Sequence, residues 1–394
     1  MSKPINSLPV KITLLLVSTL PVMSGATIAP SLPVMQEHFA NVANIDYWVR
    51  LVLTAPSLFV ALGAPFAGFI IDQLGRKPLL ALTLLVYGLA GSSGLWLNSL
   101  ELILLGRALL GLSVAGIMTT ATTLIADYYT GSARTKFFGL QAAFMALGGV
   151  MFLSFGGFLA DVSWRMPFLI YSVALLLLPL VLLILPEPNR NSQSSARQSD
   201  PQAKSVSLPL GLVVLTYGIA LLAQVVFYMV PVQLPFYLQA LTNASASQSG
   251  LAIALSTLFA AISSISYQRI KARLSFMSIY ELAFLSMGVG YGLISMANGY
   301  GIVLLGLAST GFGLGLLLPN MNLCLTSITP DVLRGRALGG FTTCFFLGQF
   351  ISPLLSQPLS QQVGLGTAYG LAGVLLMALA LGTRVIMVRQ QKST

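Results

Sequence analysis

The ten residues Gly68–Lys77, GFIIDQLGRK, are the most informative stretch of the chain. Gly75, which permits a tight turn, lies beside an acid, Asp72, and two cations, Arg76 and Lys77. Apolar runs flank the stretch on both sides, a pattern that is not typical of a water-soluble core. We therefore interpret it as a loop between two helices, and we expect the rest of the chain to be helices joined by loops of this kind.

The composition predicts an all-α integral membrane protein. Of 394 residues, 56% are hydrophobic and only 8% are charged, whereas a soluble domain carries about 25% charged residues. Apolar runs near the ~20 residues needed to cross a bilayer recur along the chain, and such runs must be helical because lipid cannot satisfy free backbone groups. We expect twelve helices, over residues 9–34, 46–71, 78–97, 101–127, 137–160, 166–186, 208–239, 248–268, 275–298, 300–324, 337–359 and 365–387.

The polar stretch 187–207 is rich in Ser, Gln, Asn and Arg and is interpreted as a cytoplasmic linker between an N-terminal bundle, 1–186, and a C-terminal bundle, 208–394. With the N-terminus inside, all of the 20 Lys and Arg residues except Arg50, Arg107 and Arg165 fall on the cytoplasmic side. This bias follows the positive-inside rule. The net charge of +10 therefore sets topology and meets lipid, and it does not imply a nucleic-acid partner.

The chain contains an internal repeat. A shift of 200 residues places LLGRALLG, 104–111, over LLGLASTG, 304–311, and places Arg134 over Arg334. The linker falls between the copies, and the shift covers an even number of helices. We therefore predict two six-helix halves with the same orientation, related by an axis along the membrane normal.

Three stretches resemble sequence signatures of the major facilitator superfamily, and within it the twelve-helix drug:proton antiporter branch. The signature between helices 2 and 3 is matched by Gly68, Asp72, Gly75, Arg76 and Lys77. This chain departs from it at one position, where Gln73 replaces a basic residue. Arg107 and Gly111 match the helix 4 signature. The antiporter signature of helix 5 is matched in part, by Gly139, Gly148, Gly156 and Gly157; its Gly-Pro pair is Phe152-Leu153 here, and Pro353 occupies the repeat position of Leu153.

The resemblance implies roles for the charged residues. Asp72 is expected to cap the start of helix 11 and latch the two halves on the cytoplasmic side, with Arg76 and Asp127 in the same charge network. The alternative is a plain positive-inside loop. Arg107 is expected to bond backbone or substrate and to assist proton movement; the alternative is that it snorkels to the outer surface and pairs with Glu101.

The resemblance also implies a central cavity lined by helices 1, 4, 7 and 10. Each polar residue there either faces the cavity or satisfies a neighbouring helix. As a set they predict an uncharged, aromatic-lined cavity for a neutral or amphipathic solute. The candidates are Ser24, Thr27, Thr119, Thr123, Tyr217, Gln224, Tyr228, Gln233, Tyr237, Asn320 and Asn322.

Acids are sparse in the expected spans. Helix 1 has none, and Glu281 is expected to snorkel toward Lys271 or Arg273. Asp127, Asp46 and His38 remain as titratable candidates. Proton coupling is therefore implied by the resemblance alone.

The leading hypothesis is a monomeric secondary transporter in a bacterial cytoplasmic membrane, with both termini cytoplasmic, that exports a small amphipathic or drug-like solute by alternating access. It uses the proton gradient and needs no cofactor or metal. The alternatives are a facilitator, an importer, a narrow exporter of a metabolite such as a siderophore, or a lipid flippase. An enzyme is not expected, because no cluster of His, Cys or acid residues is apparent.

Overall fold

The computed structural model describes residue 5 and residues 7–188, 210–330 and 333–392. The side chains of Asp72 and of residues 385–392 lie outside the described part, as does the predicted linker from residue 189 onward. Twelve helical segments are long and apolar enough to cross a bilayer, so the all-α membrane fold is confirmed. Across the described ranges every regular element is a helix.

Within each half the helices follow one another with short connections, in the order predicted. The six spans of the first half comprise α1 (Leu8–Ala26) with η1 (Ala29–Ser31) and α2 (Leu32–His38), α3 (Ile45–Leu74), α4 (Arg76–Gly91) with η2 (Ser92–Leu95), α5 (Leu100–Tyr128), α6 (Gly131–Val162), and η3 (Met166–Ser172) with α7 (Val173–Ile184). Those of the second half comprise α8 (Leu210–Phe227) with α9 (Met229–Thr242), α10 (Ala246–Lys271), α11 (Phe276–Ser295), α12 (Tyr300–Ile328), α13 (Arg334–Val363) and α14 (Leu365–Lys392).

The first and seventh spans are broken, whereas the sequence predicted one continuous helix for each. α1 ends at Ala26, just before Pro30 and Pro33, and α8 ends at Phe227, just before Pro231. Proline lacks the N–H that would continue a helix and clashes with the preceding turn. The two breaks lie about 200 residues apart, in the register of the internal repeat.

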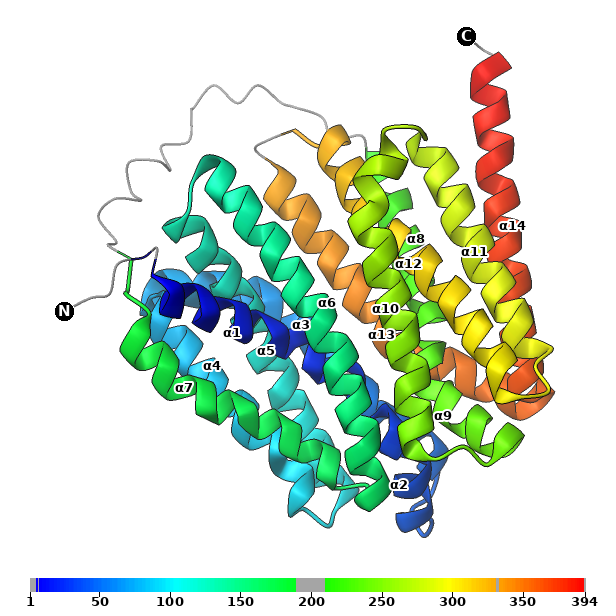
Figure 1. The fold of residues 1–394 in the computed structure, drawn as a ribbon, viewed down its shortest axis with the longest axis horizontal. Coiled ribbons are helices and arrows are strands. Elements are labelled where there is room, and N and C mark those ends of the chain that lie inside the picture. Colours follow the sequence, from blue (N-terminus) through cyan, green and yellow to red (C-terminus); the bar gives the residue numbers. More distant parts are fainter. Residues whose placement is uncertain (1–4, 6, 189–209, 331–332, 393–394) are drawn as a thin grey trace.

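The two halves meet along two seams. Figure 1 shows the one between α6 and α10 in the middle of the molecule. On one seam α3 packs against α13, and on the other α6 packs against α10. The second seam is close because it has glycine on both sides: a Cβ on Gly157 would lie 3.2 Å from the Cα of Gly250. Small residues permit such close helix packing inside a membrane.

The predicted glycine series of α6 divides into two groups. A side chain on Gly156 would strike the backbone carbonyl of Thr27, and one on Gly148 would lie 3.1 Å from Thr19. Gly139 is exposed and has nothing near it. Close packing is therefore observed at Gly148, Gly156 and Gly157, whereas Gly139 faces open space. Pro353 is buried inside α13.

The ends of the bundle differ in charge. Cations lie in or just after the connections that follow α3, α5, α10 and α12, and these connections are at the same end, which we call the cation-rich end. The opposite end, where α3, α10 and α13 begin or finish near Asp46, Ser247 and Gln361, is the cation-poor end.

Candidate functional site

A cavity of about 880 Å³ lies between the halves at the cation-rich end. Its walls come from α3 and α5 in the first half and from α13 in the second. Thr119 and Thr123, both predicted, line it, together with Thr342 and Thr343. Among the described residues, one charged side chain, Arg336, also lines it. The two halves are therefore separated at this end.

A second cavity of about 570 Å³ lies deeper, in the centre of the molecule. Val60, Met118 and Thr342 line both cavities, so the two are contiguous. Three predicted residues, Ser24, Tyr228 and Asn322, line the central cavity, with Ser57, Thr257 and Gln349 as further polar groups. Most of its wall is apolar, and its large side chains are Met118, Met145, Leu153, Leu318, Tyr228, Phe341, Phe345 and Phe346.

The sequence did not single out the three phenylalanines. They lie on α13, one of the helices outside the four expected to line the cavity. Phe345 and Phe346 follow each other directly, and nothing in their sequence context distinguishes them from packing residues.

The other polar candidates satisfy neighbouring helices rather than the cavities. The Tyr217 hydroxyl donates to the Ala337 carbonyl at 2.7 Å, and the Tyr237 hydroxyl to the Ile294 carbonyl at 2.8 Å. Two further candidates are buried in side-chain bonds between helices: Asn320 accepts from Tyr267 at 3.0 Å, and Gln224 accepts from Gln349 at 3.3 Å. Thr27 bonds the Met23 carbonyl within its own helix.

Arg107 is fully buried in the first half. Its Nε donates to the Val52 carbonyl at 2.9 Å, and its Nη2 donates to the Ser24 carbonyl at 3.0 Å. Its guanidinium carbon lies 5.0 Å from the centre of the Tyr171 ring. The structure therefore has Arg107 joining α5 to the backbones of α3 and α1. The snorkelling alternative is not what is observed, since Glu101 is exposed on the first turn of α5.

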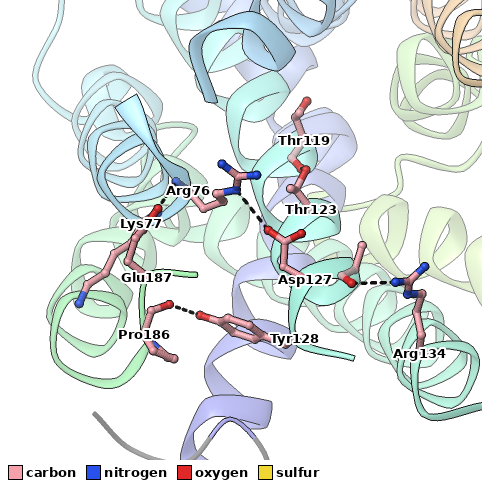
Figure 2. Close-up of polar contacts among 10 residues, drawn as sticks. Arg76, Lys77, Thr119, Thr123, Asp127, Tyr128, Arg134, Pro186 and Glu187 are labelled. Carbon is pink, nitrogen blue, oxygen red and sulfur yellow. Dashed lines mark hydrogen bonds and ion pairs between the residues drawn. The ribbon is translucent and has the colours of Figure 1, made fainter. Parts of the chain in front are cut away.

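The stretch Gly68–Lys77 takes part in a charge network at the cation-rich end (Figure 2). Only Gly75 lies outside α3 and α4, so the predicted loop is a one-residue turn between two helices. Gly75 has a φ of 96°, so it adopts the left-handed turn that favours glycine. Arg76 is buried, and its Nε lies 3.2 Å from Oδ2 of Asp127. Asp72 lies in the last turn of α3, and its side chain is outside the described part, so its predicted latch remains a prediction.

An acid that sequence reasoning passed over, Glu187, caps the helix after this loop. Its Oε1 and Oε2 each accept a backbone N–H at 2.7 Å, from Arg76 and Lys77, the first residues of α4 (Figure 2). A carboxylate at a helix N-terminus satisfies free N–H groups and complements the helix dipole. The adjacent Pro186 carbonyl accepts from the Tyr128 hydroxyl. A possible sequence signal was an acid placed directly after a span that ends near a cation-rich loop.

The internal repeat extends to a capping contact at this end. Arg134 donates to the carbonyls of Tyr129 and, at 2.9 Å, Ala126. Arg334 donates to the Thr326 carbonyl at 3.0 Å. In both cases the arginine reaches a carbonyl eight residues earlier, at the C-terminal end of the preceding helix, where a cation complements the dipole.

At the cation-poor end a buried arginine, Arg50, joins the two halves. Its Nε donates to Oε1 of Gln233 at 3.0 Å, and its Nη1 donates to Oε1 of Gln36 at 3.2 Å. Its guanidinium carbon lies 3.9 Å from the centre of the Phe236 ring. Gln233, predicted for the cavity, therefore belongs to this contact between α3 and α9.

Acids are placed away from the cavities. No acid among those with a described side chain lines either cavity. Glu281 pairs with Arg384 of α14 at 3.3 Å, so the predicted partners Lys271 and Arg273 are wrong. The reason is that α11 packs along α14, which brings a cation distant in sequence beside Glu281.

Comparison with known proteins gives a consistent result. The family model of the Major Facilitator Superfamily matches residues 14–353 and, in a second match, 216–393. The quinolone resistance protein NorA of Staphylococcus aureus (strain MRSA252) is 24% identical over 365 residues, covering 88% of this chain and 90% of that protein.

Two solved structures share the fold. A D-xylose–proton symporter superposes with a TM-score of 0.81 at 17% identity, over 95% of this chain and 96% of the other. A bacterial homologue of the human lysosomal transporter Spinster, in an inward-facing and occupied conformation, gives a TM-score of 0.76 at 17% identity, over 99% and 98% of the two chains. At these identities the structures establish the fold alone.

Proposed function

This chain belongs to the major facilitator superfamily of transporters, and from that premise we propose that it exports a small neutral or amphipathic solute from a bacterial cell. The observation that carries the proposal is the central cavity, whose large side chains are aromatic, aliphatic or thioether groups and whose described polar groups are uncharged. Such a lining suits an apolar body with a few hydrogen-bonding groups. Methionine adapts to ligands of different shape.

We propose that the cation-rich end is cytoplasmic, as the positive-inside rule favours. Both termini then lie in the cytoplasm, and the larger cavity gives solute in the cytoplasm a route to the central one. Closing that cavity and opening the cation-poor end would release the solute outside, which is alternating access. The likeness to a quinolone resistance protein supports a drug-like substrate.

The proposed energy source is the proton gradient, with no cofactor, and the proposed working unit is a monomer in the cytoplasmic membrane. An uncoupled or narrow metabolite transporter is the second candidate. The acid-free lining of both cavities, over the side chains that the structure describes, favours it. A carboxylate in the cavity would have offered a direct site for competition between proton and solute.

Accumulation of fluorescent dyes in efflux-deficient bacteria expressing the chain tests the proposal. Met118 lines both cavities, so Met118→Trp should block passage, whereas Met151→Trp makes the same change on an exposed face of α6 and should not. Export predicts low dye accumulation with the parent chain and Met151→Trp, and high accumulation with Met118→Trp.

A protonophore separates the two candidates. If it restores dye accumulation to the level of Met118→Trp, proton-driven export is supported. If export persists without the gradient, coupling is wrong. If a broad dye panel shows no difference between the Met118→Trp and Met151→Trp variants, the drug-like substrate class is wrong and the narrow metabolite transporter takes its place.

A further inference from the structure

Each of the two seams between the halves carries one carboxylate contact at the cation-poor end. On the α3–α13 seam, Oδ2 of Asp46 accepts from Nε2 of Gln361 at 3.3 Å. On the α6–α10 seam, Oδ1 of Asp161 accepts from the backbone N–H of Ser247 at 3.1 Å. In both contacts the acid belongs to the first half and the donor to the second, so both bonds break if the halves separate at this end.

The hydrogen-bond directions around Asp46 are fixed by Arg50. A guanidinium can only donate, so Gln36 must present its Oε1 to Arg50 and its Nε2 elsewhere. That Nε2 donates to Oδ1 of Asp46 at 2.6 Å. Gln361 accepts from the Tyr47 hydroxyl at 3.4 Å through Oε1, which leaves its Nε2 for Asp46. Both carboxylate oxygens of Asp46 therefore face amide donors. An ionised carboxylate accepts at both oxygens, whereas a protonated one carries on one oxygen a hydrogen that opposes the amide donor there.

Asp161 meets a helix N-terminus. Ser247 lies in the first turn of α10, where unpaired N–H groups and the helix dipole favour a negative charge. Protonation of Asp161 would remove that charge and weaken the contact. Gly157 and Gly250 lie about one turn from Asp161 and Ser247 on α6 and α10, and their close approach shows that this seam is closed here.

We propose that Asp46 and Asp161 form a proton-sensitive gate at the cation-poor end, one carboxylate on each seam, that is closed when both are ionised and opens when they are protonated. A low pH on the outer face would then favour the state open to the outside. Neither acid lines either cavity, so the proposal is that they sense protons and do not carry them across. The inference rests on the proposed alternating access but not on the substrate.

Three other charged or titratable groups near this end, Arg165, Glu101 and His38, have partners within the first half. Arg165 bonds the carbonyls of Gly94 and Leu97, and Glu101 bonds Ser99. His38 packs against Trp164. Arg50 and Tyr47 of α3 lie near Asp46, and Tyr369 of α14 lies near Arg50. Glu37 and His38 follow Gln36 on α2. Near Asp161, the Tyr300 hydroxyl donates to the Gln248 carbonyl beside Ser247.

The test measures the width of the gate directly. Spin labels on Ala43→Cys and Val363→Cys, one exposed residue per half, report the distance between the halves at this end by pulsed electron resonance in nanodiscs. The native Cys324 and Cys344 are replaced by serine. The parent chain is measured between about pH 8 and about pH 3, a range that extends below the ordinary pKa of an aspartate carboxyl, about 3.9, with no substrate and no gradient.

We expect the parent distance to lengthen as the pH falls. Asp46→Asn and Asp161→Asn should each raise the open-to-closed ratio about tenfold or more at neutral pH, because a hydrogen bond to a charged group is lost. The double variant should be more open than either single variant, and its distance should not respond to pH. Glu101→Gln and His38→Gln should keep the parent response.

Two results would overturn the gate: a parent distance that does not change with pH, or a double variant that still responds as the parent does. Loss of the response in His38→Gln would assign it to the histidine and would also overturn the proposal. Because the measurement is a distance in the absence of solute, its result does not depend on whether the chain exports dyes.

Discussion

Removing Arg107 should destabilise the protein as well as stop transport, because its side chain bonds two backbone carbonyls and lines neither cavity. The two bonds, to Val52 at 2.9 Å and to Ser24 at 3.0 Å, are donated by a charged group. Each such bond contributes about 1.5–3 kcal/mol. Part of that is offset, since Nη1 has no partner and its burial is unfavourable. We expect Arg107→Leu to lower the free energy of unfolding by about 2–4 kcal/mol.

The internal repeat provides the matched control. Leu307 occupies the equivalent place in the second half and is also fully buried. Leu307→Ala measures the effect of a cavity alone, about 2–5 kcal/mol for a buried leucine. Arg107→Ala should lose at least ~2 kcal/mol more than Arg107→Leu, because it adds a cavity of the same kind.

Denaturant unfolding in mixed micelles, followed by tryptophan fluorescence, gives these free energies, and dye export gives the activity of the same variants. If Arg107→Leu unfolds at the same denaturant concentration as the parent but does not transport, the two hydrogen bonds to backbone carbonyls do not stabilise the fold. Arg107 would then act on the solute or on protons directly, as the family resemblance implied.

Three further outcomes follow from contacts elsewhere. Glu187→Ala should lower the free energy of unfolding by about 0.5–2 kcal/mol, as for the loss of a helix cap; no change in unfolding would show that water replaces the carboxylate. Gly156→Ala should reduce folded yield on size-exclusion chromatography because its methyl group strikes a carbonyl, while Gly139→Ala, at an exposed site, should not; equal yields would contradict the close packing. Glu281 and Arg384 should couple by less than about 1 kcal/mol in a double-mutant cycle, since the arginine is 67% exposed; a larger coupling would mean that the pair is shielded from solvent.

The twelve spans and the bias of cations to one end were readable from local sequence, whereas the breaks in the first and seventh spans were not predicted. A bilayer requires long apolar runs with internally satisfied backbones, so span positions depend on composition within about 20 residues. Prolines near residues 30 and 231 were visible in the same way, although the sequence reading did not draw the break from them. The repeat relation of Arg107 to Leu307 also came from the sequence.

Which polar side chains face the cavities was decided only by the tertiary structure. Ser24 and Asn322 line the central cavity, whereas Asn320, two residues from Asn322, bonds Tyr267. A span that is apolar on nearly every face has little amphipathic pattern, so the periodicity that marks the buried face of a soluble helix is faint here. A polar group inside a membrane is satisfied equally by a neighbouring helix or by a cavity, and only the packing of distant helices determines which of the two it meets.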